Sequence, residues 1–262
     1  MYFVISLTLA RAASALAVAG FLAACGAPQE TLIAPVEVPG YGTIEDGGFV
    51  IPAVPAQYLP EHNRRTNVPY AGGEAPGSIV VDPHVKYLYH VLGDGTADRY
   101  RIAVGAEGRA LQATTYVGRK AEWPSWTPTA NMVRTMPELY ADKKNGMAPG
   151  PQNPLGARAL YLYRGGKDTM YRIHGTGDAA SIGHATSAGC IRLYNQDILD
   201  LYAKVEGRPN VTIRSEAESR ALEGDAAFEQ AKADDARALE RIEAERLAAI
   251  AASAEAAAPA VE

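Results

Sequence analysis

Short segments of alternating polar and apolar residues, separated by turns that contain glycine or proline, run through residues 77–214. Alternation with a period of two predicts strands that bury one face. One segment of this region, 195–205, has helical periodicity instead, with Asn195 as a candidate cap. The predicted strands are 78–82, 86–91, 99–104, 159–163, 171–174 and 211–214. We therefore expect a mostly β domain with one well-defined helix.

The chain before this domain divides into two parts. Residues 1–24 contain Arg11 followed by an apolar run that is too short to span a bilayer unaided, which is typical of a targeting segment. Residues 25–76 are rich in proline and glycine, which disfavours helices and central strands. We predict a tether there, with a short ordered patch at 49–59.

The chain after the domain is rich in alanine and glutamate. Residues 216–262 predict an acidic helical tail behind a domain that spans 77–215. The large apolar residues of the tail keep no heptad register, so a solvated helix or loose tether is favoured over a coiled coil.

Charge is distributed unevenly between these parts. Residues 77–214 hold 17 Lys and Arg against 12 Asp and Glu, whereas residues 215–262 hold 5 against 12. A mildly basic domain suits a substrate with carboxylates. It has no dense basic stripe interleaved with aromatic residues, so we expect no nucleic-acid partner.

The chain has two cysteines, Cys25 and Cys190. The first ends the sequence LAAC at 22–25, which resembles a bacterial lipoprotein signal that is cut before the cysteine so that the cysteine can receive lipid. An uncut anchor over 2–24 is the alternative. If Cys25 is lipidated, Cys190 has no disulfide partner within the chain, and an unpaired thiol outside the cytoplasm is more often reactive than structural.

Three residue types around Cys190 suit acyl transfer. Gly189 allows a tight turn before the thiol, and His174, at the end of a predicted strand, is the best candidate to take the thiol proton. Arg192 is suited to hold a carboxylate. Taken singly, each has an ordinary alternative: a structural histidine, a buried small thiol or a surface charge.

The motifs HGTG at 174–177 and SAGCIR at 187–192 resemble those of the L,D-transpeptidases of the YkuD (ErfK/YbiS/YcfS/YnhG) family. Segments at 77–105, 123–129, 153–161 and 183–202 are also similar, so the resemblance covers about residues 77–214. It implies a YkuD-like β-sandwich or barrel with a helix after the nucleophile, to which the chain adds its C-terminal Ala/Glu-rich helix.

The resemblance also implies roles for individual residues. Cys190 would be the nucleophile, and His174 the general base and acid, oriented by the main-chain carbonyl of Gly175. Backbone N–H groups of Ala188, Gly189 and Cys190 would form the oxyanion hole.

Two further residues are implied in substrate binding: Ser187 supports the loop and Arg192 engages a substrate carboxylate. One departure is Ala188, because the family commonly has histidine there. A backbone donor survives this change, whereas a side-chain role does not. No cofactor is implied and no metal, because Cys190, His174 and His184 lack the spacing of a zinc cluster.

The implied activity is transfer between peptidoglycan stem peptides through a thioester at Cys190, giving 3→3 cross-links or attaching a protein to peptidoglycan. Two alternatives stay open: an L,D-carboxypeptidase or hydrolase with the same thiol, and a catalytically weak peptidoglycan-binding lipoprotein. The expected location is the periplasm and cell envelope, with a membrane anchor at Cys25. Gly26 after that cysteine weakly favours the outer membrane.

Overall fold

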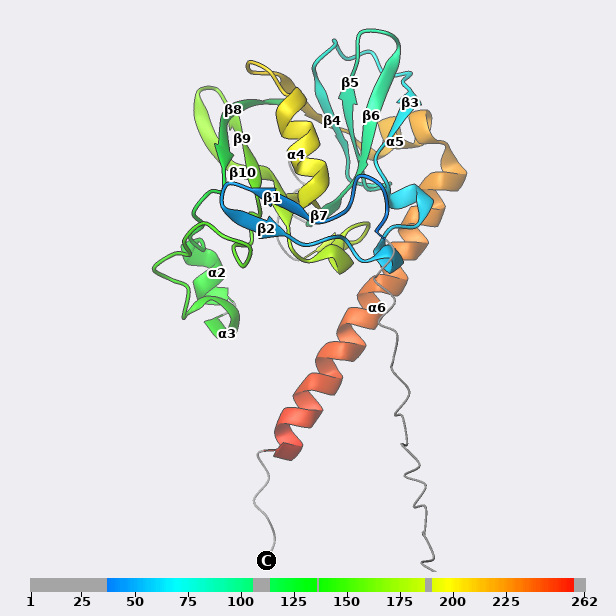
Figure 1. Ribbon diagram of the computed structural model, residues 1–262. Helices are drawn as coiled ribbons and strands as arrows, with labels where there is room; N and C mark the ends of the chain where they lie inside the picture. The colour runs from blue at the N-terminus through cyan, green and yellow to red at the C-terminus, as the bar shows by residue number, and fades with distance from the viewer. Residues whose placement is uncertain (1–36, 106–113, 136, 187–189, 257–262) are drawn as a thin grey trace, which may run out of the picture. The chain divides into compact units, whose positions relative to one another are not determined.

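The computed structural model describes residues 37–105, 114–135, 137–186 and 190–256. Strands dominate these stretches and helices are few (Figure 1). No helix within the described stretches has both the length and the apolar character needed to cross a membrane.

Eleven strands of the described chain form one sheet, in the order β11-β7-β12-β10-β9-β8-β13-β4-β5-β6-β3. A separate antiparallel hairpin pairs β1 with β2. The bounds are β1 (Ile44–Asp46), β2 (Phe49–Ile51), β3 (Thr66–Pro69), β4 (Ile79–Asp82), β5 (Tyr87–Val91), β6 (Thr96–Arg101), β7 (Ala103–Gly105), β8 (Thr115–Glu122), β9 (Arg158–Arg164), β10 (Lys167–Thr176), β11 (Ala185–Thr186), β12 (Ile191–Tyr194) and β13 (Asn210–Ile213).

The sheet curls on itself because one stretch of chain reaches both of its ends. Only Ile102 separates β6 from β7, yet β6 pairs with β5 and β7 pairs with β12. An apolar core fills the interior, and Ile102, Leu160 and Ile173 have no exposed surface there. The expected mostly β, barrel-like fold with a helix after the nucleophile is confirmed.

That helix is α4 (Asn195–Lys204), which follows β12 directly and packs on β9 and β10 (Figure 1). Its residues Ile198 and Leu201 are fully buried in the core. The Nζ of Lys120 donates to the carbonyls of Tyr202, at 2.7 Å, and Val205, at 2.6 Å, so it satisfies acceptors that a helix C-terminus leaves open.

Two local expectations in this region need revision. β8 was not among the predicted strands, because its buried residues alternate with polar ones only at its start, where Thr115 and Val117 are buried. The short helix expected at 130–140 is two pieces, α2 (Ala130–Thr135) and α3 (Pro137–Tyr140). Pro137 begins the second piece, where its missing N–H costs nothing.

The predicted tether differs most from the structure, because residues 37–76 are folded. Tyr41, Val54 and Leu59 are buried against Tyr194. Prolines precede the 3-10 helices η1 (Ala56–Tyr58) and η2 (Glu61–Asn63), and Pro69 ends β3, the edge strand of the sheet. These are the positions that proline tolerates, so its abundance does not exclude order.

The tail begins with two helices rather than the single one expected. Ser215 and Glu218 form a capping box at the start of α5 (Glu216–Glu223). Gly224 then adopts a φ of 86°, which ends α5 before α6 (Asp225–Ala256) begins.

The start of α6 is attached to the domain rather than solvated. Phe228 is buried, with its ring 5.4 Å from that of His84. The Nζ of Lys86, itself buried, lies 2.6 Å from a carboxylate oxygen of Asp235. Leu247, farther along, is 57% exposed. The first part of the tail therefore docks on the turn between β4 and β5 through a few contacts, and the residues that make them follow no periodic sequence pattern.

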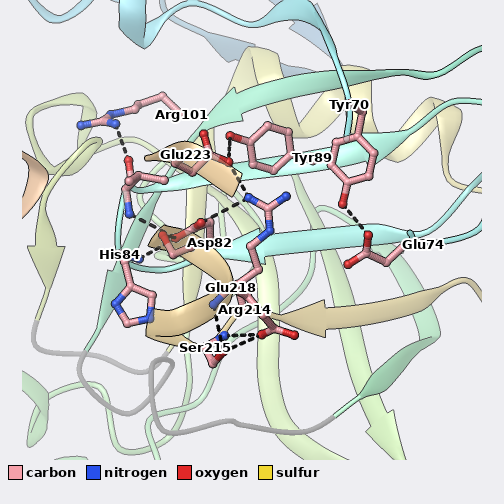
Figure 2. A network of polar contacts seen from close by, with 12 residues as sticks. Tyr70, Glu74, Asp82, His84, Tyr89, Arg101, Arg214, Ser215, Glu218 and Glu223 are labelled. Atoms are coloured by element: carbon pink, nitrogen blue, oxygen red, sulfur yellow. Dashed lines mark hydrogen bonds and ion pairs between the residues drawn. The ribbon is translucent and has the colours of Figure 1, made fainter. Parts of the chain in front are cut away.

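Buried polar contacts also join α5 to the sheet (Figure 2). Asp82 of β4 is fully buried and accepts hydrogen bonds from Arg214, at 3.3 Å, and from the Ser219 hydroxyl, at 3.0 Å. Arg214 also pairs with Glu223, which accepts a hydrogen bond from the Tyr89 hydroxyl. The network links strands to α5 through charged and polar side chains, whose burial would be unfavourable without these mutual hydrogen bonds and ion pairs.

Candidate functional site

The site is organised by two neighbouring parallel strands, β10 and β12. Their register pairs Ile173 with Ile191 and His174 with Arg192. Both isoleucines point into the core, and side chains alternate along a strand, so His174 and Arg192 lie together on the opposite face. Cys190 directly precedes β12 and is partly exposed. The sheet thus brings the predicted thiol, imidazole and guanidinium to adjoining positions.

The His174 ring is buried and held by its own neighbour. Its Nδ1 lies 2.7 Å from the carbonyl oxygen of Gly175, which can only accept, so Nδ1 carries the proton and Nε2 is left as the basic nitrogen. Burial lowers the pKa of His174 to about 4; the Gly175 hydrogen bond opposes this, and the charges of Arg192 and Arg172 add to it. The imidazole is therefore neutral near pH 7.

Gly175 allows α4 to approach the histidine strand closely. A Cβ at Gly175 would lie 2.2 Å from Oδ1 of Asn195 and 2.9 Å from Cγ2 of Ile198. Asn195 is not the helix cap that its position suggested, because Tyr194 occupies that place. Its Oδ1 accepts from the Ala157 N–H at 2.9 Å, and its Nδ2 donates to the carbonyl of Thr176 at 3.1 Å. Asn195 thus ties the end of β10 to the segment before β9.

Gly175→Ala is expected to lower the free energy of unfolding by about 1–3 kcal/mol, because the new methyl group overlaps the buried side chains of Asn195 and Ile198. Gly177→Ala is the matched control: its Cβ would meet only the Pro151 carbonyl, at 3.6 Å, so we expect a change below about 0.5 kcal/mol. Urea unfolding of both variants measures the difference. Equal midpoints would show that α4 is not packed tightly on β10.

A cavity of about 400 Å³ lies beside Arg192, at the carboxyl ends of β10 and β12. The β1–β2 hairpin contributes one part of its wall, and neither His174 nor Cys190 lines it. The lining comprises residues 50–52, Trp123, 151–154, 176–178, Arg192 and Asn195. A larger cavity of about 540 Å³ is lined by residues 75–78, 90–93 and others at 204–210, and contains none of the predicted site residues.

Other predicted site residues lie outside the described stretches. These are Ser187, Ala188 and Gly189 of the turn before Cys190, together with Cys25. His184 is found between the 3-10 helix η3 (Ala179–Ser181) and β11. The described residues contain no group of three or more His, Cys, Asp or Glu side chains arranged to hold a metal ion.

Sequence reasoning missed several residues that shape the site. Arg172 is buried, carries a charge that acts on His174, and is paired with both carboxylate oxygens of Asp168. It stands two residues before His174, so strand alternation could have placed the two on one face. No local sequence pattern pointed to Trp123 or to the β1–β2 hairpin, because their position next to Arg192 depends on how the sheet closes.

Comparison with known families adds an independent observation. Residues 76–214 match the YkuD family model, described as the L,D-transpeptidase catalytic domain. The match covers slightly more than half of the chain and includes both β10 and β12.

Individual relatives were also found. The chain is 35% identical over 131 residues to the probable L,D-transpeptidase YbiS of Escherichia coli K12, covering 49% of this chain and 41% of that protein. It therefore spans about two fifths of that relative's length. A Brucella melitensis crystal structure named as a probable carnitine operon oxidoreductase is 45% identical, covering 57% of this chain and 93% of that one, with a TM-score of 0.42. An L,D-transpeptidase from Mycobacterium smegmatis is 14% identical, covering 52% of this chain and 58% of that one, with a TM-score of 0.39.

Proposed function

Because the chain belongs to the YkuD family of L,D-transpeptidase catalytic domains, we propose that it transfers acyl groups between peptidoglycan stem peptides through a thioester at Cys190. The observation that carries this proposal is the pairing of His174 with Arg192 across β10 and β12, next to Cys190. A base and a carboxylate-binding cation thus adjoin the only cysteine of the matched domain.

In the first half-reaction, Nε2 of His174 takes the thiol proton as Sγ attacks the carbonyl between the third and fourth residues of the donor stem. The tetrahedral intermediate collapses with cleavage of the C–N bond, and the imidazolium returns its proton to the leaving D-amino acid. In the second half-reaction, an acceptor amine attacks the thioester and passes its proton to His174, Cys190 leaves as a thiolate, and the imidazolium returns the proton to it to restore the thiol. An amine of a neighbouring stem gives a 3→3 cross-link, and an amine of an anchored protein gives a protein attachment.

Main-chain donors near the thiol stabilise the charge that develops on the carbonyl oxygen. We assign the N–H groups of Ala188, Gly189 and Cys190 to this role, with Ser187 supporting their turn. Backbone donors do not depend on the side chain at position 188, so the alanine there is compatible with catalysis. Arg192 holds a carboxylate of the donor and so fixes its carbonyl near Cys190.

The same proposal places the enzyme in the cell envelope. Lipid on Cys25 would hold the chain at a membrane facing the peptidoglycan, with the outer membrane favoured by Gly26. Retention of the mature protein in the detergent phase, and its loss on Cys25→Ala, would test the anchor.

The pH dependence of kcat/KM is expected to have its acidic limb near pH 4 rather than near 6.5. The basic form of His174 is neutral and persists down to its lowered pKa of about 4, below which protonation removes the base. Rates measured from pH 3 to 8, with circular dichroism at each pH to confirm folding, check this. A limb at pH 6 or above would contradict either the burial of His174 or its role as the base.

The direct test of the proposed function is intact-protein mass spectrometry after incubation with a disaccharide-tetrapeptide, and separately with a carbapenem. We expect a covalent adduct that peptide mapping assigns to Cys190. Adding an acceptor stem should then yield cross-linked product. Free tripeptide as the sole product would instead identify a hydrolase. No adduct from either compound with a folded protein would leave a peptidoglycan-binding protein as the better description.

A further inference from the structure

The β1–β2 hairpin lies outside the segment that matches the family model, yet it lines the cavity beside Arg192. We propose that this hairpin completes a subsite for the carboxylate-bearing part of the donor stem peptide. This inference rests on the proposed function and names the residues that select its donor.

The hairpin is held rigidly against the catalytic domain. The carboxylate of Asp46 accepts two hydrogen bonds from the Arg158 guanidinium, at 2.7 and 2.8 Å, and one from Nε1 of Trp123 at 2.7 Å. These partners, Arg158 first, hold the pKa of Asp46 below its usual value despite partial burial. The Phe49 ring packs 4.5 Å from that of Trp123.

A second anchor joins the residues flanking the hairpin to α4. The Nε2 of Gln196, which is buried, donates to the carbonyls of Gly42 at 3.0 Å and Pro52 at 2.9 Å. The hairpin is thus fixed from both ends by groups of the catalytic domain. A wall held in this way is preorganised, so little ordering cost remains when a ligand binds.

The lining of the cavity combines apolar surface with one cation. Val50, which is 53% exposed, provides most of the apolar surface, and the largely buried Ile51 and Trp123 line the wall behind it. Arg192 supplies positive charge, and Asp178 is an exposed carboxylate on another part of the lining. Such a lining suits a peptide residue that carries a carboxylate beside an aliphatic group.

The position of the cavity relative to the thiol fits an extended peptide. Arg192 lies two residues after Cys190, and Asn195 lies five residues after it. At a strand rise of about 3.3 Å per residue, these residues are roughly 7 Å and 16 Å along the chain from the thiol. A donor with its carbonyl at Cys190 reaches this distance within a few residues. Arg192, the one cation among the described residues of the lining, attracts a carboxylate, and the donor is the peptide whose carbonyl must be held at Cys190, so we assign the cavity to the donor.

Charge substitutions at Val50 test the subsite. In full-length Cys190→Ala protein, which cannot turn over, we expect Val50→Asp to raise the Kd for the disaccharide-tetrapeptide at least tenfold. Val50→Lys should leave the Kd unchanged or lower it, because a cation there attracts the same carboxylate. A merely structural disturbance would move both variants in one direction. Leu247→Asp, an equally exposed apolar site on α6, should leave the Kd unchanged.

Isothermal titration calorimetry gives these Kd values, and thermal unfolding confirms that each variant is folded. If Val50→Asp binds like its parent while the wild-type enzyme acylates, the subsite is wrong and the proposed function stands. If Val50→Asp made in the enzyme that retains Cys190 affects only the acceptor KM, leaving the single-turnover acylation rate unchanged, the assignment to the donor is wrong. If the wild-type enzyme forms no acyl adduct, both the function and the subsite fall.

Discussion

Cys190→Ala is expected to lower transpeptidation by at least about 10⁴-fold, because residues 76–214 contain no other cysteine to form the thioester. The fold should persist, because Cys190 is partly exposed at the start of β12 and its truncation creates little cavity. We expect the free energy of unfolding to change by less than about 1 kcal/mol. Product formation from a disaccharide-tetrapeptide and an acceptor stem measures the first effect, and urea unfolding the second.

Cys190→Ser is the matched control for this substitution. It keeps a similar volume and a proton on the side chain, but its hydroxyl is a much weaker nucleophile than a thiolate at neutral pH. Most of the activity should therefore be lost in this variant too. Turnover within tenfold of wild type in Cys190→Ala would refute the thioester mechanism. An equal loss accompanied by unfolding would indicate a structural role instead.

Arg214→Met is expected to lower the free energy of unfolding by about 3–5 kcal/mol, because it removes one partner of a buried ion pair. Asp82 is fully buried and Arg214 is 4% exposed (Figure 2). Once the guanidinium is removed, water cannot reach the Asp82 carboxylate to solvate its charge. The same substitution also removes the ion pair between Arg214 and Glu223, the last residue of α5. Urea unfolding followed by tryptophan fluorescence measures the effect.

Two further variants separate charge burial from simple loss of contacts. Arg237→Met removes an arginine on α6 whose ion pair with Asp234 is at the surface, so we expect a change below about 0.5 kcal/mol. The double variant Asp82→Asn, Arg214→Met removes the charge at both ends and should recover part of the stability lost in Arg214→Met. Additive losses in the double variant would show that the two residues do not act as a pair.

Local sequence patterns were enough to predict β4, β5, β9, β10 and β13, and a single strand where the structure has β6 and β7. The alternating segments at 86–91 and 171–174 fall within β5 and β10, apart from the residue before β5. The same alternation predicts that Ile173 faces the core and His174 the other face, as observed. β8 escaped prediction because its alternation is limited to its start; its only lysine, Lys120, serves the end of α4, and no local pattern encodes that use.

The sequence by itself determined the strand-rich fold class and the helix after Cys190. Each depends on periodicity or on a short motif, and both are local properties of the chain. Tertiary structure alone decided that residues 37–76 fold, that Asn195 joins separate segments, and that His174 is buried enough to stay neutral. The physical reason is that these features arise where distant residues meet. The burial of a proline-rich segment, or of a charged group, is favourable only once the closed sheet supplies its partner.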